Sequence, residues 1–356
     1  MTFEANFASI MSEPTVAPST GDEYWPDVEK DQNGDGVSDA SRVGVPAFSV
    51  PPPPDIVRLP NLTEDERRIE ESFADAFEAD PEKMASDYRK VVLDMAKEDN
   101  DVPTFATDDA KVQHPDWAGK GMPLEQRATN RAKYNCALHQ TANAVAKRAF
   151  LQHLDTLSEG DQVLVTVGGC GAGKGHALKN SPAALEMKKT AKAIWDSAGD
   201  QNATENPWIQ SELEKRGLKG AYLYVHADPR VFWMHEGYGV IARARKLDNG
   251  RMVDAAVFAD SYVIGAKNHQ AFYKNNKDNP NAKFLFLKSG SGDQLKEMPK
   301  EALELDRREL KKFALQKIAE MKDLEPRIRI GASIGTRVWR GEEKKKGGKK
   351  NGAKAS

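Results

Sequence analysis

The sequence is poor in cysteine and has no long apolar run, and both absences narrow the classes of protein to which it can belong. Only Cys136 and Cys170 are cysteines among 356 residues, so a disulfide framework is excluded and a reducing, cytoplasmic location is expected. No run approaches the roughly 18 apolar residues that a membrane helix needs. The first residues, MTFEANFASIMSEP, lack the basic segment of a secretory signal. We therefore expect a soluble protein without a membrane partner.

Net charge is also small, but its distribution along the chain is uneven. The formal charge of -2 combines 26 acidic and 9 basic residues in residues 1–110 with 28 acidic and 43 basic residues in the remainder. One interpretation is that the acidic part only keeps a flexible arm solvated. The other is that it folds back on the basic part as an intramolecular inhibitory partner, or that a separate partner takes this role.

Residues 1–61 are rich in Pro, Ser, Asp and Gly, and we expect them to form a disordered acidic segment. Within this segment, alternating oxygen-bearing side chains have the spacing of a calcium loop. Arg42 stands at the twelfth position of that loop, where an EF-hand has a bidentate glutamate. Two interpretations stay open, a Ca2+ site and a solvated turn. The four expected ligands are Asp31, Asn33, Asp35 and Asp39.

Residues 62–124 are expected to form a small helical region followed by a linker. Thr63 and Glu66 have the spacing of a capping box, and Asp80-Pro81 separates two expected helices. Residues 99–123 contain three prolines and are expected to be a loop. A single long helix is then expected over 124–157, and its basic face is more typical of a solvated surface than of nucleic-acid binding.

From residue 163 the sequence alternates between short apolar strands and helices, which indicates a parallel sheet covered on both faces. We expect a three-layer α/β sandwich of the P-loop NTPase class over residues 125–330, followed by a basic tail over residues 331–356. The expected strands are 163–167, 193–195, 221–225 and 282–287, and the expected helices are 178–192, 206–216, 230–246, 254–276 and 301–322.

The segment after the first of these strands is typical of a phosphate-binding loop. Glycines let the backbone wrap around one phosphate, and the lysine that follows would reach the β- and γ-phosphates of ATP. Gly175 stands where the usual pattern has a Ser or Thr that holds Mg2+, so the metal would be held through water or by acids elsewhere. The expected ATP-binding residues are Gly168, Gly169, Cys170, Gly171, Ala172, Gly173, Lys174, Gly175 and His176.

Three further residues are expected to act with the loop. Asp196 ends a predicted strand, so it would face the phosphates and either bind Mg2+ or take the proton from the attacking hydroxyl. Arg243 and Arg251 would close over the transferring phosphate and neutralise its charge. With Lys174, these residues form the predicted catalytic group. Polar residues of the expected helix 254–276 would contact a substrate, or its aromatic residues would form core and leave the polar ones exposed.

The loop, the strand-end acid and the segment Arg243-x7-Arg251-x-Val253 together resemble the zeta-toxin family of P-loop kinases, in particular its longer bacterial members. The resemblance covers roughly residues 125–325. It implies an ATP-dependent kinase that phosphorylates the sugar of a nucleotide-linked amino sugar, with Lys174 at the phosphates and Arg243 and Arg251 as lid arginines. The early Asp-x-x-Arg of the family is missing, so either Asp196 is the base or substrate and mechanism differ.

The sequence thus predicts a kinase that transfers the γ-phosphate of ATP, with Mg2+, to a hydroxyl of a small-molecule acceptor such as a nucleotide sugar. One alternative is an NTP-binding or NTP-hydrolysing switch protein. The other is a nucleic-acid-end kinase that uses the basic tail to hold its polymer, although nucleic acid is not the favoured partner.

Overall fold

The computed structural model describes residue 56 and residues 58–198, 203–236, 239–247, 252–290 and 292–340. All of these belong to one compact unit, Gly44–Ser356. Several expectations lie outside the described residues. They are the acidic segment up to residue 55, the calcium loop with Asp31, Asn33, Asp35 and Asp39, the lid residue Arg251, and the charged tail after residue 340.

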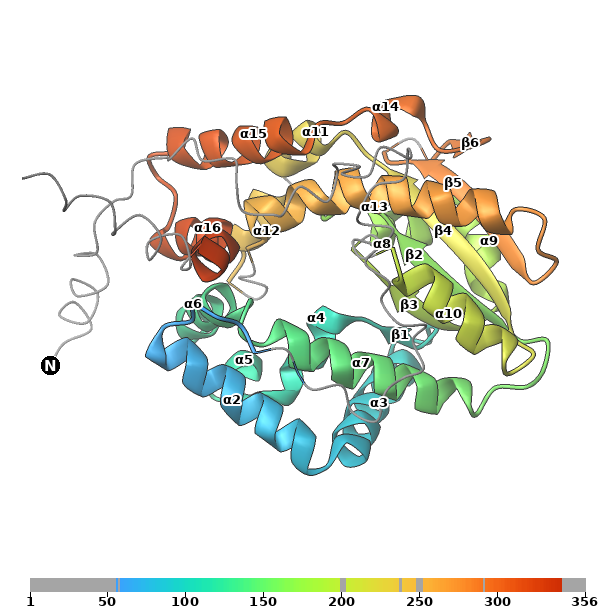
Figure 1. The fold of residues 1–356 in the computed structure, drawn as a ribbon, viewed down its shortest axis with the longest axis horizontal. Coiled ribbons are helices and arrows are strands. Elements are labelled where there is room, and N and C mark those ends of the chain that lie inside the picture. Colours follow the sequence, from blue (N-terminus) through green and yellow to red (C-terminus); the bar gives the residue numbers. More distant parts are fainter. Residues whose placement is uncertain are drawn as a thin grey trace, which may run out of the picture. The chain divides into compact units, whose positions relative to one another are not determined.

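The centre of the fold is a mixed, mostly parallel sheet that has six strands among the described residues, in the order β1-β3-β2-β4-β5-β6 (Figure 1). The first five strands are parallel to their neighbours, and β6 pairs antiparallel with β5. The expected α/β class with a largely parallel sheet is therefore confirmed. The strands are β1 (Thr104–Phe105), β2 (Gln162–Val167), β3 (Ala191–Asp196), β4 (Lys219–His226), β5 (Ala282–Lys288) and β6 (Gln294–Leu295).

Helices cover both faces of this sheet and extend beyond it (Figure 1). They are α2 (Glu64–Ala79), α3 (Pro81–Glu98), α4 (Thr107–Ala110), the 3-10 helix η2 (Lys111–Gln113), α5 (Pro115–Ala118), α6 (Leu124–Tyr134), α7 (His139–Leu154), α8 (Lys174–Asn180), α9 (Pro182–Thr190), α10 (Glu205–Glu214), α11 (Pro229–Met234), α12 (Val240–Arg245), α13 (Ala255–Asn276), α14 (Lys300–Leu303), α15 (Arg307–Glu320) and α16 (Pro326–Arg340).

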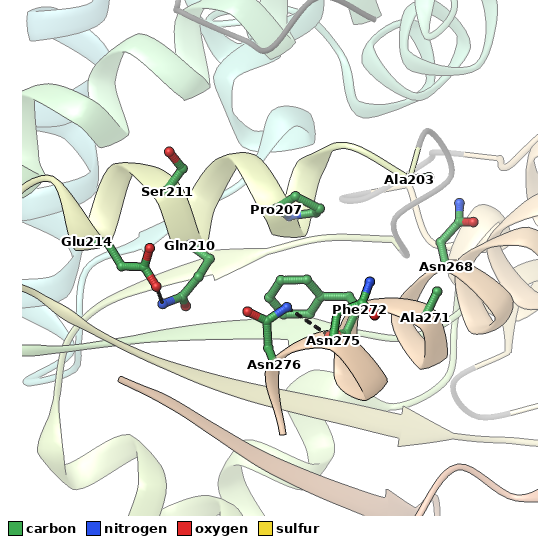
Figure 2. A pocket seen from close by; sticks show the side chains of 10 residues that line it. All are labelled: Ala203, Pro207, Gln210, Ser211, Glu214, Asn268, Ala271, Phe272, Asn275 and Asn276. Atoms are coloured by element: carbon green, nitrogen blue, oxygen red, sulfur yellow. Dashed lines mark hydrogen bonds between the residues drawn. The ribbon is translucent and has the colours of Figure 1, made fainter. Parts of the chain in front are cut away.

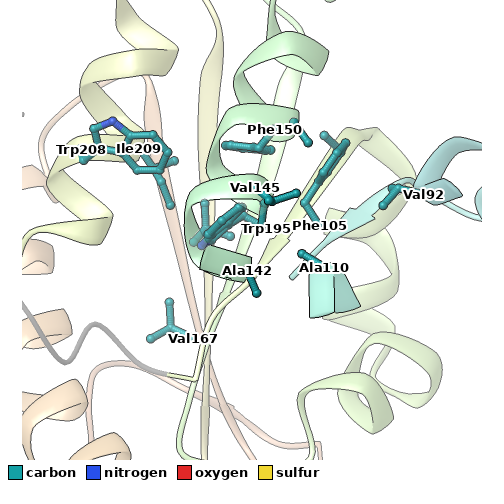
Figure 3. Close-up of a cluster of buried hydrophobic side chains, with 14 of the residues drawn as sticks. Val92, Phe105, Ala110, Ala142, Val145, Phe150, Val167, Trp195, Trp208 and Ile209 are labelled. Atoms are coloured by element: carbon teal, nitrogen blue, oxygen red, sulfur yellow. The ribbon is translucent and has the colours of Figure 1, made fainter. Parts of the chain in front are cut away.

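One face of the sheet packs against α7, α10 and the second half of α13. Successive side chains of a strand point to opposite faces, so Val163, Val165 and Val167 of β2 all enter this core. There they meet Trp195 of β3 and Phe150 of α7, whose ring centroids are 5.1 Å apart (Figure 3). The opposite face, which includes Leu164, packs against buried residues of α8 and α9.

The N-terminal helices share the first of these cores, so the expected separate helical region is continuous with the sheet domain. Phe73 and Phe77 of α2 and Tyr88 of α3 are almost fully buried in the same cluster as the strand residues. The start of α2 follows the sequence closely. Thr63 caps it and Glu66 reaches back to the Thr63 backbone, which confirms the predicted capping box.

The segment 99–123 is not the continuous loop that the sequence predicted. Thr104 and Phe105 form β1, which pairs in parallel with β3 at the sheet edge, and α4, η2 and α5 follow at once. Phe105 is fully buried between Tyr88 and Phe150. The prolines at 103 and 115 flank these elements instead of interrupting them, because each stands where no helical or ladder N–H is needed.

Four expected helices are broken into shorter ones. The helix expected over 124–157 is α6 and α7, and that over 178–192 spans the end of α8 and all of α9 and stops where β3 begins. The helix expected over 230–246 is α11 and α12, and that over 301–322 is α14 and α15. The expected tail is partly wrong as well, because α16 continues to Arg340. Ile328 and Ala332 of α16 are buried in a third core with α11, α12, α13 and α15. The domain therefore extends past the predicted boundary at 330.

Among the described residues, no helix combines the length and the apolar character that crossing a membrane requires.

Candidate functional site

The strand order places a topological switch point at the carboxyl ends of β2 and β3. These two parallel strands are neighbours, but α8 and α9, which follow β2, pack on one face of the sheet and α10, which follows β3, packs on the other. The connections therefore leave the two strands in opposite directions. In open α/β sheets, ligands bind in the crevice that forms at such a point.

The glycine-rich segment 168–173 forms the loop between β2 and α8, and we call it the glycine loop. Gly173 has a φ of 87°, a left-handed conformation that residues with a side chain rarely adopt. A Cβ on Gly169 would lie 2.4 Å from the ring of Tyr262, which is closer than packed atoms can approach. Glycine at these positions therefore lets the backbone turn tightly and pack directly against α13.

Lys174 is the first residue of α8, and its side chain turns back over the loop. Its Nζ lies 3.2 Å from the carbonyl oxygen of Gly168 and 3.7 Å from Oδ1 of Asp196. Asp196 ends β3, next to Thr166 in the sheet register, and accepts a hydrogen bond of 2.5 Å from Thr166 Oγ1. The Asp196 carboxylate is 41% exposed, so it faces the opening of the crevice. The structure thus brings the predicted lysine and acid together.

Arg243 approaches the loop from another part of the chain. A Cβ on Gly171 would lie 3.7 Å from Arg243 Nη2 and 3.3 Å from Cγ2 of Val240. Both residues belong to the short helix α12. A guanidinium therefore stands beside the glycine loop, at a position that the sequence predicted only as the arm of a lid.

Two residues of α13 form hydrogen bonds to the backbone of the glycine loop. The sequence did not predict this role for them. Ser261 Oγ accepts a hydrogen bond of 3.0 Å from the Cys170 N–H, and the Tyr262 hydroxyl donates one of 3.3 Å to the Cys170 carbonyl. Phe258 and Tyr262 are buried, and Asp260 forms an ion pair with Arg307. This stretch of α13 therefore fits the core interpretation, with Ser261 and Tyr262 as supports of the loop.

The carboxyl ends of β4 and β5 complete the rim of the crevice. The Ser289 N–H donates a hydrogen bond of 2.7 Å to the His226 carbonyl, and a Cβ on Gly173 would lie 2.8 Å from Ser289 Oγ. A small cavity of about 40 Å3 opens here beside the loop, lined by Gly173, His176, Ala177, Asn180, Ser181, Lys288, Ser289, Gly290 and Gly292. The signal that would have found Ser289 is its position directly after a predicted strand.

His226 is the titratable side chain at the end of β4. Burial lowers the pKa of its imidazole from the ordinary value of 6.5, and the nearby acids Glu301 and Asp228 oppose this effect only partly. The ring is therefore mostly neutral at neutral pH and is able to accept a proton.

A larger groove of about 330 Å3 lies between α10 and α13 (Figure 2). No residue of the glycine loop lines it. Its polar groups are amides, a serine and the Glu214 carboxylate, and Gln210 Nε2 donates a hydrogen bond of 2.7 Å to that carboxylate. Phosphate binding needs cationic side chains or converging N–H groups. A groove whose one charged lining residue is an acid does not fit phosphate.

The acids near the glycine loop are the residues that could hold Mg2+. No group of three or more His, Cys, Asp or Glu side chains able to hold a metal occurs in the described part of the chain. Mg2+ does not need such a group, because it usually keeps several waters and binds one or two carboxylates together with substrate phosphates. Asp196 beside the loop fits that mode. Glu205 is another acid in the connection after β3, and its Oε2 accepts a 2.5 Å hydrogen bond from Ser197, the residue that follows Asp196.

Comparisons with known proteins supply no independent assignment. No protein-family model matches the sequence, and no curated protein matches it either. The resemblance to the zeta-toxin family therefore rests on the motif residues alone.

Proposed function

We propose that the protein is an ATP-dependent phosphotransferase that moves the γ-phosphate to a hydroxyl of a small molecule. One observation carries the proposal. Lys174 at the start of α8 lies 3.7 Å from Asp196 at the end of the neighbouring strand, and Arg243 approaches the intervening glycine loop. Phosphoryl transfer is catalysed mainly by positioning and by neutralising the charge of the moving group, and a lysine, an arginine and an acid around a glycine loop supply both.

Each residue has a distinct role in this proposal. The glycine loop directs backbone N–H groups at the phosphates, and Lys174 exchanges its contact with the Gly168 carbonyl for the β- and γ-phosphate oxygens. Arg243 neutralises charge that develops on the transferring group. When bound, Mg2+ would supply positive charge that offsets the negative charge of the phosphates. Asp196 is the residue that would hold it, through water because Gly175 offers no hydroxyl.

The proton of the attacking hydroxyl needs an acceptor, and the groups that end β3 and β4 are two candidates. Asp196 is exposed at the crevice, but it already pairs with Lys174 and Thr166. His226 has an imidazole that burial keeps neutral. We assign Asp196 to the metal and leave His226 as the further proton acceptor to be tested by substitution.

The test uses the full-length protein with ATP, Mg2+ and an extract of bacterial metabolites, and mass spectrometry detects species that gain one phosphate. Lys174→Ala is expected to lower the rate by about 100- to 1000-fold, because a preorganised charge is lost from the transferring group. Lys179→Ala is the matched control. It removes a lysine from the last turn of the same helix, where the side chain is exposed, and it is expected to leave the rate unchanged.

The departure at Gly175 favours one rival, a nucleotide-dependent switch. If the wild-type protein binds ATP and Lys174→Ala does not, but no acceptor gains phosphate, the switch interpretation replaces the kinase. If neither protein binds ATP, the phosphate-binding role of the loop is wrong.

A further inference from the structure

We infer that Arg327, far from the glycine loop in sequence, is a positioning residue that holds Arg243 at that loop. The inference rests on the proposed function, since Arg243 is the group through which Arg327 would act. Arg327 lies in the first turn of α16, a segment that the sequence predicted as the end of the domain.

The helix that carries Arg243 cannot hold its own position. α12 has only six residues, and helices of this length are not stable without tertiary contacts. Its start is fixed by Gly239, where a Cβ would lie 2.6 Å from backbone atoms of His235. Its apolar residues Val240, Ile241 and Ala244 are buried. These contacts place the beginning and one side of α12, but its C-terminal end needs a separate anchor.

Arg327 supplies that anchor. Its side chain is only 7% exposed. Nη1 donates a hydrogen bond of 2.6 Å to the Ala244 carbonyl, and Nη2 donates one of 3.4 Å to the Arg245 carbonyl. The last carbonyls of a helix lack partners within the helix, and a cation at this end also interacts favourably with the helix dipole. One guanidinium therefore satisfies two adjacent carbonyls, directly after Arg243.

The start of α16, which carries Arg327, is itself held in place by several contacts. Nε of Arg327 donates a hydrogen bond of 2.7 Å to the Glu325 carboxylate, which orients the guanidinium. Ile328 is fully buried on the same helix. A Cβ on Gly331 would lie 2.6 Å from Cβ of Met252, so α16 packs closely against the chain just after α12. Arg327 thus connects α16, which is packed firmly in the core, to the C-terminal end of α12.

This geometry predicts a specific dependence between the two arginines. Arg327 donates hydrogen bonds to the carbonyls at the end of α12 and to Glu325, whereas Arg243 approaches the glycine loop. Loss of the anchor should release the C-terminal end of α12 and move the Arg243 guanidinium. The rate should then fall only because Arg243 is displaced. The affinity for nucleotide, which depends on the loop and Lys174, should change little.

The experiment is a double-mutant cycle on the full-length protein with Arg327→Met, Arg243→Ala and the double variant. The phosphoryl-transfer or ATPase rate and the affinity for ATP are measured for each. Arg327→Met is expected to lower kcat about 10- to 100-fold, the effect of losing a hydrogen-bonded charge, with KM for ATP nearly unchanged. In the Arg243→Ala background it should have no further effect.

Arg329→Met is the matched control. Arg329 is two residues further along α16 and donates to the carbonyls of Ile318 and Met321 instead of to α12, so its loss should leave kcat within about twofold of wild type. Arg327→Lys keeps the charge but loses the two-pronged geometry, and it should restore part of the rate. This variant also carries the test if Arg327→Met does not fold.

A second readout does not depend on activity. Amide hydrogen exchange in residues 240–245 should accelerate in Arg327→Met and not in Arg329→Met. Unchanged exchange in α12, or equal losses of rate with and without Arg243, would overturn the positioning role. A wild-type protein without nucleotide binding would refute the proposed function instead, and the exchange result would still report whether Arg327 anchors α12.

Discussion

At the residue scale, α13 binds both backbone polar groups of Cys170 in the glycine loop. Tyr262 donates to the carbonyl and Ser261 accepts from the N–H. This arrangement differs from a loop shaped by glycine alone, because it fixes the direction in which the peptide dipoles point. Preorganised dipoles lose little free energy on ligand binding, so under the proposed function the two α13 residues would support nucleotide binding by fixing the shape of the loop.

Replacing Tyr262 by Phe should weaken the loop with little change in the core. The variant keeps the ring under Gly169 but leaves the Cys170 carbonyl without its donor, which costs about 1 kcal/mol of unfolding free energy. Urea denaturation measures this loss, and titration with a fluorescent ATP analogue should show a weaker Kd. Tyr273→Phe on the same helix is the control, since the Tyr273 ring packs on Phe284 and Phe286 away from the loop. Equal effects of the two variants would contradict the proposed support.

His269 is the residue for which the structure predicts a pH dependence of stability. Its ring is fully buried against Tyr224, and burial lowers its pKa from 6.5 to about 3. Between these values the unfolded chain binds a proton that the folded chain does not. Stability is therefore complete above pH 6.5 and falls as the pH is lowered toward 3, by up to about 1.4 kcal/mol per pH unit.

His269→Gln tests this dependence. The variant has no group that titrates at this position, so its unfolding free energy should fall less steeply between pH 6.5 and 5 than that of the wild type. Above pH 7.5 the two slopes should be equal, which serves as the internal control. Chemical denaturation at each pH provides the measurement, and parallel curves over the whole range would show that His269 is not the source.

At the element scale, the two-residue strand β1 contributes to the core far more than its length suggests. Phe105 is fully buried, with its ring centroid 5.6 Å from that of Phe150 and 6.3 Å from that of Tyr88. It therefore joins the edge of the sheet to α3 and α7. β1 also adds a neighbour to β3, the strand that ends in Asp196.

Phe105→Ala should destabilise the protein by about 3–5 kcal/mol, because a buried aromatic ring is lost and a cavity stays. Val91→Ala on α3 is the control, since Val91 is 37% exposed and surface changes usually alter stability by less than about 0.5 kcal/mol. Urea midpoints of the two variants give the comparison. A loss below about 1 kcal/mol for Phe105→Ala would mean that β1 is not part of the core in solution.

At the scale of the whole molecule, the C-terminal helix α16 contributes to two buried clusters. Ile328 lies in the third core and Ile334 packs with Leu59, and burial of each isoleucine stabilises the fold by about 1.5–3 kcal/mol. Removal of both would use up much of a typical total stability of about 5–15 kcal/mol. We expect a chain that ends at Glu325 to lose cooperative unfolding, as followed by circular dichroism.

The matched control is a chain that ends at Arg340. It retains α16 and lacks only the charged residues 341–356, so it should unfold as the full chain does and keep its activity. The same control separates two functions. A nucleic-acid-end kinase that uses the basic tail would lose polynucleotide binding, and that binding would weaken steeply with salt. Activity that persists in this chain contradicts that rival.

Local patterns of the sequence predicted a large part of the fold. The short apolar runs 163–167, 221–225 and 282–287 predicted β2, β4 and β5, because both faces of these strands are buried and such runs are recognisable within a few residues. The capping box at Thr63 and the proline at position 81 predicted the starts of α2 and α3, because helix-start signals are also local in the sequence. Elements that depend on distant partners were missed. β1 pairs with β3, which comes much later in the chain, and α16 resembles a basic tail until Ile328 packs in the third core and Ile334 packs with Leu59.

The sequence by itself determined the α/β class, the glycine loop with Lys174 and the position of Asp196 at a strand end, because each follows from residues adjacent in the chain. Only the tertiary structure decided that α13 supports the loop, that Arg243 reaches Gly171 and that Arg327 anchors α12. These contacts join residues that are far apart in the chain. Ala244 and Arg327 are separated by 83 positions, and Cys170 and Tyr262 by 92. Periodicity and turn chemistry act over a few residues, so contacts at this range become visible only when the chain is folded.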